Sequence, residues 1–104
     1  MIDLFVPASI RRLIVYPNPI DTRWGPQRLR DACERVLGVE LDTATAVLFH
    51  NRAQDTLVLY CLDADGDRSV TKKLDRGVFL LPAPGAGRKY AVVDASKVGT
   101  LFRS

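Results

Sequence analysis

The sequence predicts an α+β fold, in which a small antiparallel sheet carries one main helix and the chain ends in a second, short helix. Two patterns lead to this prediction. From Val47 to Pro82, apolar runs of strand length alternate with polar turns, which is typical of an antiparallel meander. From Pro26 to Leu37, apolar residues recur with the 3.6-residue period of a helix. A chain of 104 residues suffices for one core, so we expect a single domain over residues 1–104.

The chain before the helix holds one clear strand. The run from Arg12 to Tyr16 is β-branched and aromatic, which favours a buried strand, and Pro17-Asn-Pro19 then forms a rigid loop. The segment from Ile2 to Val6 alternates weakly and stops at a proline, so it is either a short edge strand or a mobile arm.

The helix has recognisable start and stop signals. Asp21 or Thr22 could cap a turn that includes Trp24, but we favour Gly25 as the N-cap with Pro26 at the first helical position, where a missing N–H costs little. Gly38 suits the left-handed residue that ends a helix. The apolar face that we expect to pack on the sheet comprises Leu29, Ala32, Cys33, Val36 and Leu37.

The meander contains most of the predicted sheet. We expect strands from Ala46 to Phe49, Leu57 to Leu62, Arg68 to Leu74 and Val78 to Leu81. The second of these is apolar on both faces, so both faces should be covered. Asp65-Gly66 predicts a two-residue type I′ turn, and Gly77 separates the last two strands.

Beyond the meander, one more strand and one helix complete the expected fold. Lys89 to Val93 reads as a strand that follows a loop from Pro82 to Gly87. Asp94 is placed to cap the short C-terminal helix, which would bury Val98, Leu101 and Phe102.

Composition limits the class of protein. With 47% hydrophobic and 26% charged residues, the chain is globular rather than disordered. It has no apolar run of about 18 residues, so we expect no membrane partner, and Met1 to Val6 is too short for a secretory signal. Cys33 and Cys61 each lie in an apolar pattern, which indicates buried thiols in a cytoplasmic protein.

No motif of catalysis, metal binding or cofactor binding is present. His50 has no cysteine or carboxylate at ligand spacing, and no serine stands in a nucleophile motif. The acidic turn from Asp63 to Asp67 has its glycine at the fourth position instead of the sixth, and the twelfth position, where a calcium loop has an acid, is Leu74. We therefore predict a protein that is not an enzyme, with no metal, no catalytic residue and no cofactor.

Charge is divided unevenly along the chain, whose net charge is +3. Residues 1–67 contain seven Lys or Arg against ten Asp or Glu, whereas residues 68–104 contain eight against two. The basic half is either a phosphate-facing surface or a solvated face.

The order of motifs resembles the IS66 Orf2 family, also called TnpB, a small accessory protein encoded by IS66-type insertion sequences. The landmarks are Asp21-Thr-Arg23 before the helix, Phe49-His-Asn51-Arg52 after a strand, and Asp65-Gly66. The most specific block is Lys-Lys-Leu-Asp-Arg-Gly-Val-Phe, residues 72–79. The resemblance runs from about Leu13 to Phe102.

The resemblance implies a role in transposition beside a separate catalytic transposase. The basic residues at matching positions are then expected to contact DNA phosphates: Arg23, Arg52, Lys72, Lys73 and Arg76. Asp21 is expected to cap the helix or orient an arginine, while Asp65, Gly66 and Gly77 are structural. Four positions carry no charge where the family has a basic residue, namely Trp24, Ala53, Gln54 and Val78. The DNA surface should therefore be weaker than that of a typical member.

The loss of charge leaves a second function open. The chain is alternatively a protein-interaction module, or a modulator encoded by a phage or mobile element, that keeps the fold and binds a protein partner. Trp24 is the residue expected to contact that partner, because tryptophan is enriched at interface hot spots. The expected partners are thus DNA, the transposase or another protein, and the oligomeric state is open.

Overall fold

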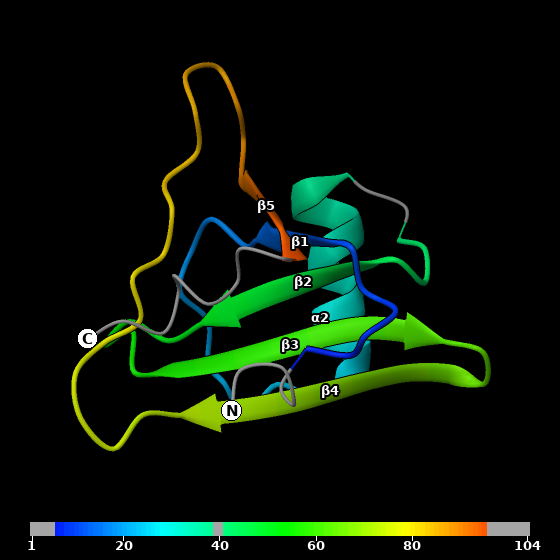
Figure 1. The fold of residues 1–104 in the computed structure, drawn as a ribbon, viewed down its shortest axis with the longest axis horizontal. Coiled ribbons are helices and arrows are strands. Elements are labelled where there is room, and N and C mark those ends of the chain that lie inside the picture. Colours follow the sequence, from blue (N-terminus) through cyan, green and yellow to red (C-terminus); the bar gives the residue numbers. More distant parts are fainter. Residues whose placement is uncertain (1–5, 39–40, 96–104) are drawn as a thin grey trace.

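The computed structural model describes residues 6–38 and 41–95. Its centre is one five-stranded sheet (Figure 1). The strands are β1 (Arg12–Val15), β2 (Thr45–His50), β3 (Thr56–Asp63), β4 (Gly66–Lys73) and β5 (Ala91–Asp94). They lie in the order β4-β3-β2-β1-β5, so β4 and β5 form the two edges.

The sheet is mixed, whereas the sequence predicted an antiparallel one. The meander is confirmed, because β2, β3 and β4 pair antiparallel as successive neighbours. However, β1 pairs parallel with β2, with Leu13 opposite Ala46, and antiparallel with β5. A parallel pair requires a crossover connection, and the helix lies within the one that joins β1 to β2. The turn residues of the meander predict only the pairing of strands that follow one another in the chain, so they do not predict the pairing of β1 with β2 or β5.

The main helix is confirmed over its full predicted length but changes type midway. It starts as α2 (Pro26–Ala32), with Gly25 as N-cap and Pro26 in its first turn. It continues as the π-helical turn η1 (Cys33–Leu37) and ends at Gly38, whose φ of 63° and ψ of 29° are left-handed. Val36 lies within this wider π turn and is 41% exposed instead of joining the core.

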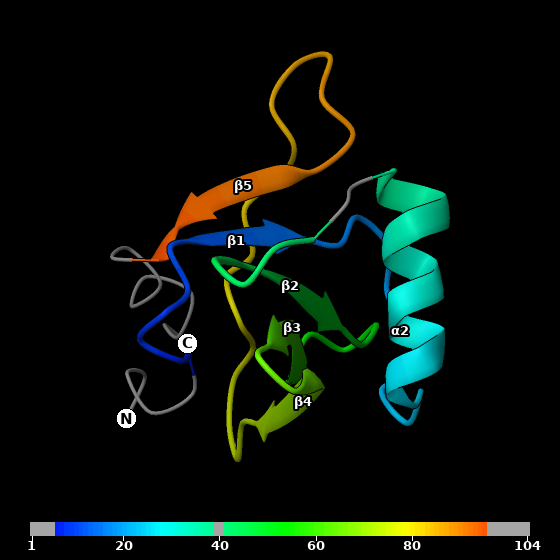
Figure 2. The ribbon, with the colours of Figure 1, turned by 90° about the vertical axis from the view of Figure 1, so that its right-hand side faces the viewer.

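Two apolar clusters lie on opposite faces of the sheet. The helix covers one face, where Leu29 and Cys33 pack against Val47 and Tyr60. The chain before β1 and the chain after β4 cover the other face (Figure 2). There Ile10 and Phe79 pack against side chains of the inner strands such as Leu48. As predicted, β3 is covered on both faces, since its residues contribute to both clusters.

The hairpin between β3 and β4 turns one residue earlier than predicted. Asp63 pairs with Gly66, so the two turn residues are Ala64 and Asp65. Neither has a positive φ, which rules out the type I′ turn that was expected. The Asp63 carboxylate accepts the Asp65 N–H at 3.0 Å, an Asx turn with glycine at the fourth position.

The remaining differences lie near the C-terminus. The segment from Val78 to Leu81 is not a strand, although Phe79 within it is buried. Asp94, which was expected to cap a helix, is the last residue of β5, opposite Arg12. The expected C-terminal helix falls outside the described residues, as does most of the expected N-terminal strand or arm.

Candidate functional site

Two loops that are far apart in the sequence meet at one end of the sheet. The Leu74 N–H donates to the Asp55 carbonyl oxygen at 2.8 Å, and the Phe79 N–H donates to the Gln54 carbonyl oxygen at 2.7 Å. The chain after β4 is thereby fastened to the β2–β3 loop, at the left of Figure 1. The burial of Phe79 holds this contact in place.

Asn51 orders the β2–β3 loop. Its Oδ1 accepts the N–H groups of Asp55 at 3.1 Å and Thr56 at 3.2 Å, and its Nδ2 donates to Asp55 Oδ1 at 2.6 Å. The Thr56 hydroxyl also donates to Asp55 Oδ1. These hydrogen bonds, with the charge of Lys73 as a smaller contribution, lower the pKa of the Asp55 carboxyl. The loop also places Gln54 in the left-handed region, at a φ of 59°.

Four of the five predicted DNA-binding residues come together here, and we call this group the basic end. It comprises Arg52, Lys72, Lys73 and Arg76. Lys72 lies opposite Leu57 and Lys73 opposite Thr56, so the two lysines point to opposite faces of the sheet. Arg52 and Arg76 are exposed on the two joined loops. The charges therefore surround the end of the sheet instead of forming a flat patch.

Gly77 makes the loop of the basic end possible. Its φ of 77° is in the left-handed region, which glycine adopts at little cost. The turn at this position lets the chain reverse between the Leu74 and Phe79 hydrogen bonds. The structural role expected for Gly77 thus has a geometric basis.

The fifth predicted residue, Arg23, belongs to a different part of the molecule. It lies on the loop between β1 and α2, where Asp21 holds its guanidinium through Nε–Oδ1 and Nη2–Oδ2 contacts of 3.0 and 2.9 Å. The hydrogen bonds from the Arg23 side chain and backbone lower the pKa of Asp21 to about 2. Asp21 therefore orients an arginine and does not cap the helix.

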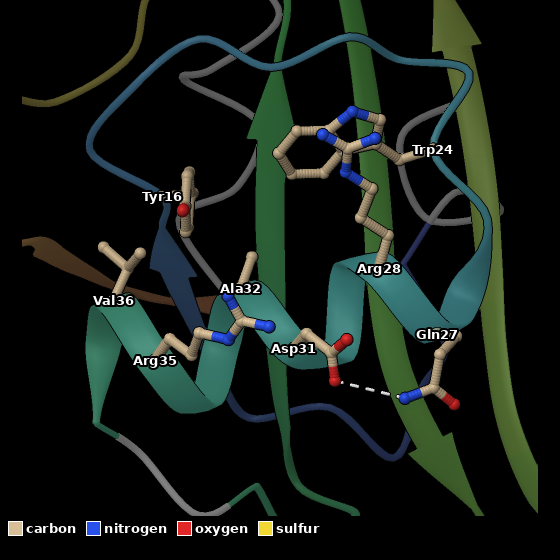
Figure 3. A pocket seen from close by; sticks show the side chains of 8 residues that line it. All are labelled: Tyr16, Trp24, Gln27, Arg28, Asp31, Ala32, Arg35 and Val36. Carbon is tan, nitrogen blue, oxygen red and sulfur yellow. Dashed lines mark hydrogen bonds between the residues drawn. The ribbon is translucent and has the colours of Figure 1, made fainter.

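Beside this loop, a groove runs between Trp24 and the helix, and we call it the Trp24 groove (Figure 3). Its volume is about 520 Å³. The Arg28 guanidinium lies 4.4 Å from the centre of the Trp24 ring, a cation–π contact. The lining residues are Tyr16, Trp24, Gln27, Arg28, Asp31, Ala32, Arg35 and Val36.

Sequence reasoning singled out Trp24 but missed the other residues of this groove. One available signal was the spacing, because Arg28, Asp31 and Arg35 follow one another at three or four residues along the helix. The sequence contains no such sign for Tyr16 and Val36, because their apolar surroundings predict that both are core residues. Val36 reaches the groove as a result of the π turn.

The His50 side chain is buried and contacts the backbone. It is 8% exposed, and its Nε2 and Nδ1 lie 3.2 Å from the carbonyl oxygens of Tyr16 and Asn51. It thus joins β2 to the chain after β1. Within residues 6–38 and 41–95, no three His, Cys, Asp or Glu side chains are grouped so as to hold a metal ion. The same part of the chain has no helix with the length and apolarity needed to cross a membrane.

Comparison with protein families gives a direct result. The model of the IS66 Orf2 like protein family matches residues 11–104, which is nearly the whole chain. The chain belongs to the IS66 Orf2-like family. No curated protein and no solved structure gives a significant match.

Family membership supports the role of an accessory protein encoded by an insertion sequence. In this IS66 Orf2-like protein, the most specific block of the resemblance, residues 72–79, is hydrogen-bonded to the loop that begins with the Asn51-Arg52 landmark. The block supplies the Leu74 and Phe79 N–H groups, and the carbonyl oxygens of Asp55 and Gln54, just after Arg52, accept them. The motif that identifies the family thus builds the basic end.

Proposed function

We propose that this IS66 Orf2-like protein is a non-catalytic accessory factor of IS66-type transposition that contacts DNA phosphates through the basic end. Family membership supports the accessory role. The proposal for DNA depends on one observation: two backbone hydrogen bonds gather Arg52, Lys72, Lys73 and Arg76 around one end of the sheet.

The chemistry of the basic end favours positioning over sequence recognition. Lysine and arginine contacts to phosphate fix the register of a protein on DNA but carry no sequence information themselves. Ala53, Gln54 and Val78 add no charge at the same end. We therefore expect weak binding to duplex DNA with little sequence preference.

Fluorescence anisotropy of a labelled duplex, titrated at several salt concentrations, tests this proposal. Affinity falls as salt rises, and each phosphate contact adds about 0.9 to the steepness of the slope of log affinity against log salt. We expect Arg52→Ala and Arg76→Ala each to reduce this slope by about one and to weaken binding equally across sequences. Arg30→Ala is the matched control, because Arg30 is an exposed arginine on the helix, 3.9 Å from Glu34. Absence of binding by the unmodified protein at low salt would overturn the proposal.

A second candidate function is docking to the transposase or another protein through Trp24. The Trp24 groove favours it, because an aromatic residue in a concave, partly apolar surface is a common interface anchor. Coexpression with the transposase of the same insertion sequence tests it. We expect the two proteins to copurify and Trp24→Ala to release the transposase, while Arg52→Ala leaves the complex intact.

A further inference from the structure

The Trp24 groove has the form of a prepared binding site for one apolar side chain. Figure 3 shows Tyr16 and Trp24 standing apart above the helix, with Ala32 between them. Ala32 is small, so it leaves space that a longer side chain would fill. Tyr16 is held in place by Phe49, whose ring centre is 4.7 Å away. The volume of about 520 Å³ is within the range of ligand sites.

Charged groups are placed around this apolar centre. Arg28 and Arg35 are exposed on the helix beside the groove. Asp31 lies between them along the helix and accepts a hydrogen bond from Gln27 Nε2 at 3.1 Å. The site therefore offers two cations for carboxylates and one carboxylate for a backbone N–H group.

We propose that the Trp24 groove binds a short acidic peptide segment of a partner protein, with one large apolar side chain inserted over Ala32. Carboxylates on either side of that anchor would pair with Arg28 and Arg35, and a peptide N–H would donate to Asp31. This proposal deepens the docking function suggested above and does not depend on DNA binding at the basic end.

One of these features disfavours a nucleic-acid strand in this groove. The Arg28 guanidinium covers one face of the Trp24 ring, which a base would need for stacking. An acidic peptide does not need to stack on the Trp24 ring, because its anchor is aliphatic or aromatic and its charges remain at the rim.

Trp24 itself supplies the measurement, since it is the single tryptophan of the chain. The probe is an acetylated and amidated peptide, Glu-Asp-Leu-Phe-Asp-Glu, titrated while Trp24 emission is followed. We expect a saturable change in emission. We also expect that the same peptide with lysine in place of each acidic residue gives no change.

Three variants locate the binding. Arg35→Glu should weaken it by about tenfold or more, because a cation at the rim becomes an anion. Val36→Glu should do the same, and since Val36 is 41% exposed this variant should fold normally. Ala32→Leu should abolish binding without any change of charge, and circular dichroism checks that it folds, because Ala32 is a buried member of the helix-side cluster. Arg30→Glu is the control and should leave the affinity unchanged, because Arg30 does not line the groove.

Two results would overturn the proposal. One is an affinity that falls equally with Arg30→Glu and Arg35→Glu, which would indicate general attraction to a basic protein. The other is a saturable response to a single-stranded oligonucleotide in place of the acidic peptide. DNA anisotropy with Val36→Glu separates the two functions, because this variant should bind duplex DNA as the unmodified protein does.

Discussion

Asn51 is the residue on which the geometry of the basic end most depends. Its amide is at once an acceptor for two backbone N–H groups and a donor to the Asp55 carboxylate. A residue with only one of these capacities would leave part of the loop unpaired. Asn51 carries no charge for DNA, yet it positions the loop that carries Arg52 and accepts the Leu74 and Phe79 bonds.

The Asp21–Arg23 pair gives a pH-dependent prediction. Its hydrogen bonds lower the pKa of Asp21 to about 2. The pair therefore contributes to the stability of the folded protein at pH values above the ordinary carboxyl pKa, and this contribution is lost as pH falls through about 2. We expect Arg23→Ala to raise this pKa part of the way toward about 3.9, because the backbone N–H at position 23 still donates.

Carboxyl NMR titration measures the pKa of Asp21 directly. Arg30→Ala is the control and should leave that pKa unchanged. The depression should also shrink with added salt, because both side chains are exposed and their attraction is screened. An Asp21 pKa that stays near 2 in Arg23→Ala would contradict this account.

At the scale of the element, the π turn η1 decides which helix residues are buried. A uniform α-helix would place both Val36 and Leu37 on the sheet. In the structure Leu37 is 4% exposed and Val36 is 41% exposed. The predicted apolar face is thus divided at the π turn: Leu37 packs in the core, whereas Val36 lines the Trp24 groove.

Alanine substitutions test this division. We expect Leu37→Ala to lower the free energy of unfolding by about 2–5 kcal/mol, because it leaves a cavity against the sheet. Val36→Ala should cost less than about 1 kcal/mol, because its side chain is largely in solvent. Urea unfolding followed by circular dichroism measures both. Equal losses would contradict this division, because they would indicate that Val36 is as buried as Leu37.

At the scale of the whole molecule, a single sheet separates two cores, and each contains one buried thiol. Cys33 lies in the helix-side cluster and Cys61 in the cluster on the opposite face. Burial, with a smaller contribution from Glu34, raises the pKa of Cys33 to about 12. Burial also raises the pKa of Cys61. Both thiols are therefore protonated and shielded in the folded protein.

This arrangement predicts that the two thiols become reactive together. Because β2 and β3 contribute side chains to both clusters, loss of one core should destabilise the other, and unfolding should be cooperative. We expect iodoacetamide labelling, followed by mass spectrometry at increasing urea, to give one free energy of unfolding for both cysteines. Earlier labelling of Cys33 would instead indicate that the helix opens separately.

The sequence by itself determined the main helix, the central meander and the family. Periodicity and end signals predicted the helix from Pro26 to Leu37 and its boundaries at Gly25 and Gly38, all of which are confirmed. Alternation of apolar runs with turns predicted the β2–β3–β4 meander. The order of short motifs indicated the IS66 Orf2-like family, which the family match confirms. These features depend on neighbours within a few residues, and such neighbours are visible in the sequence.

Only the tertiary structure decided how these elements meet. The parallel pairing of β1 with β2 and the π turn depend on packing between distant segments. The separation of Arg23 from the other predicted DNA contacts, and the groove between Trp24 and the helix, have the same origin. Apolar patterns specify that a face is buried but not which segment covers it, because many segments can bury the same area. The two candidate surfaces therefore became visible only once the chain was folded.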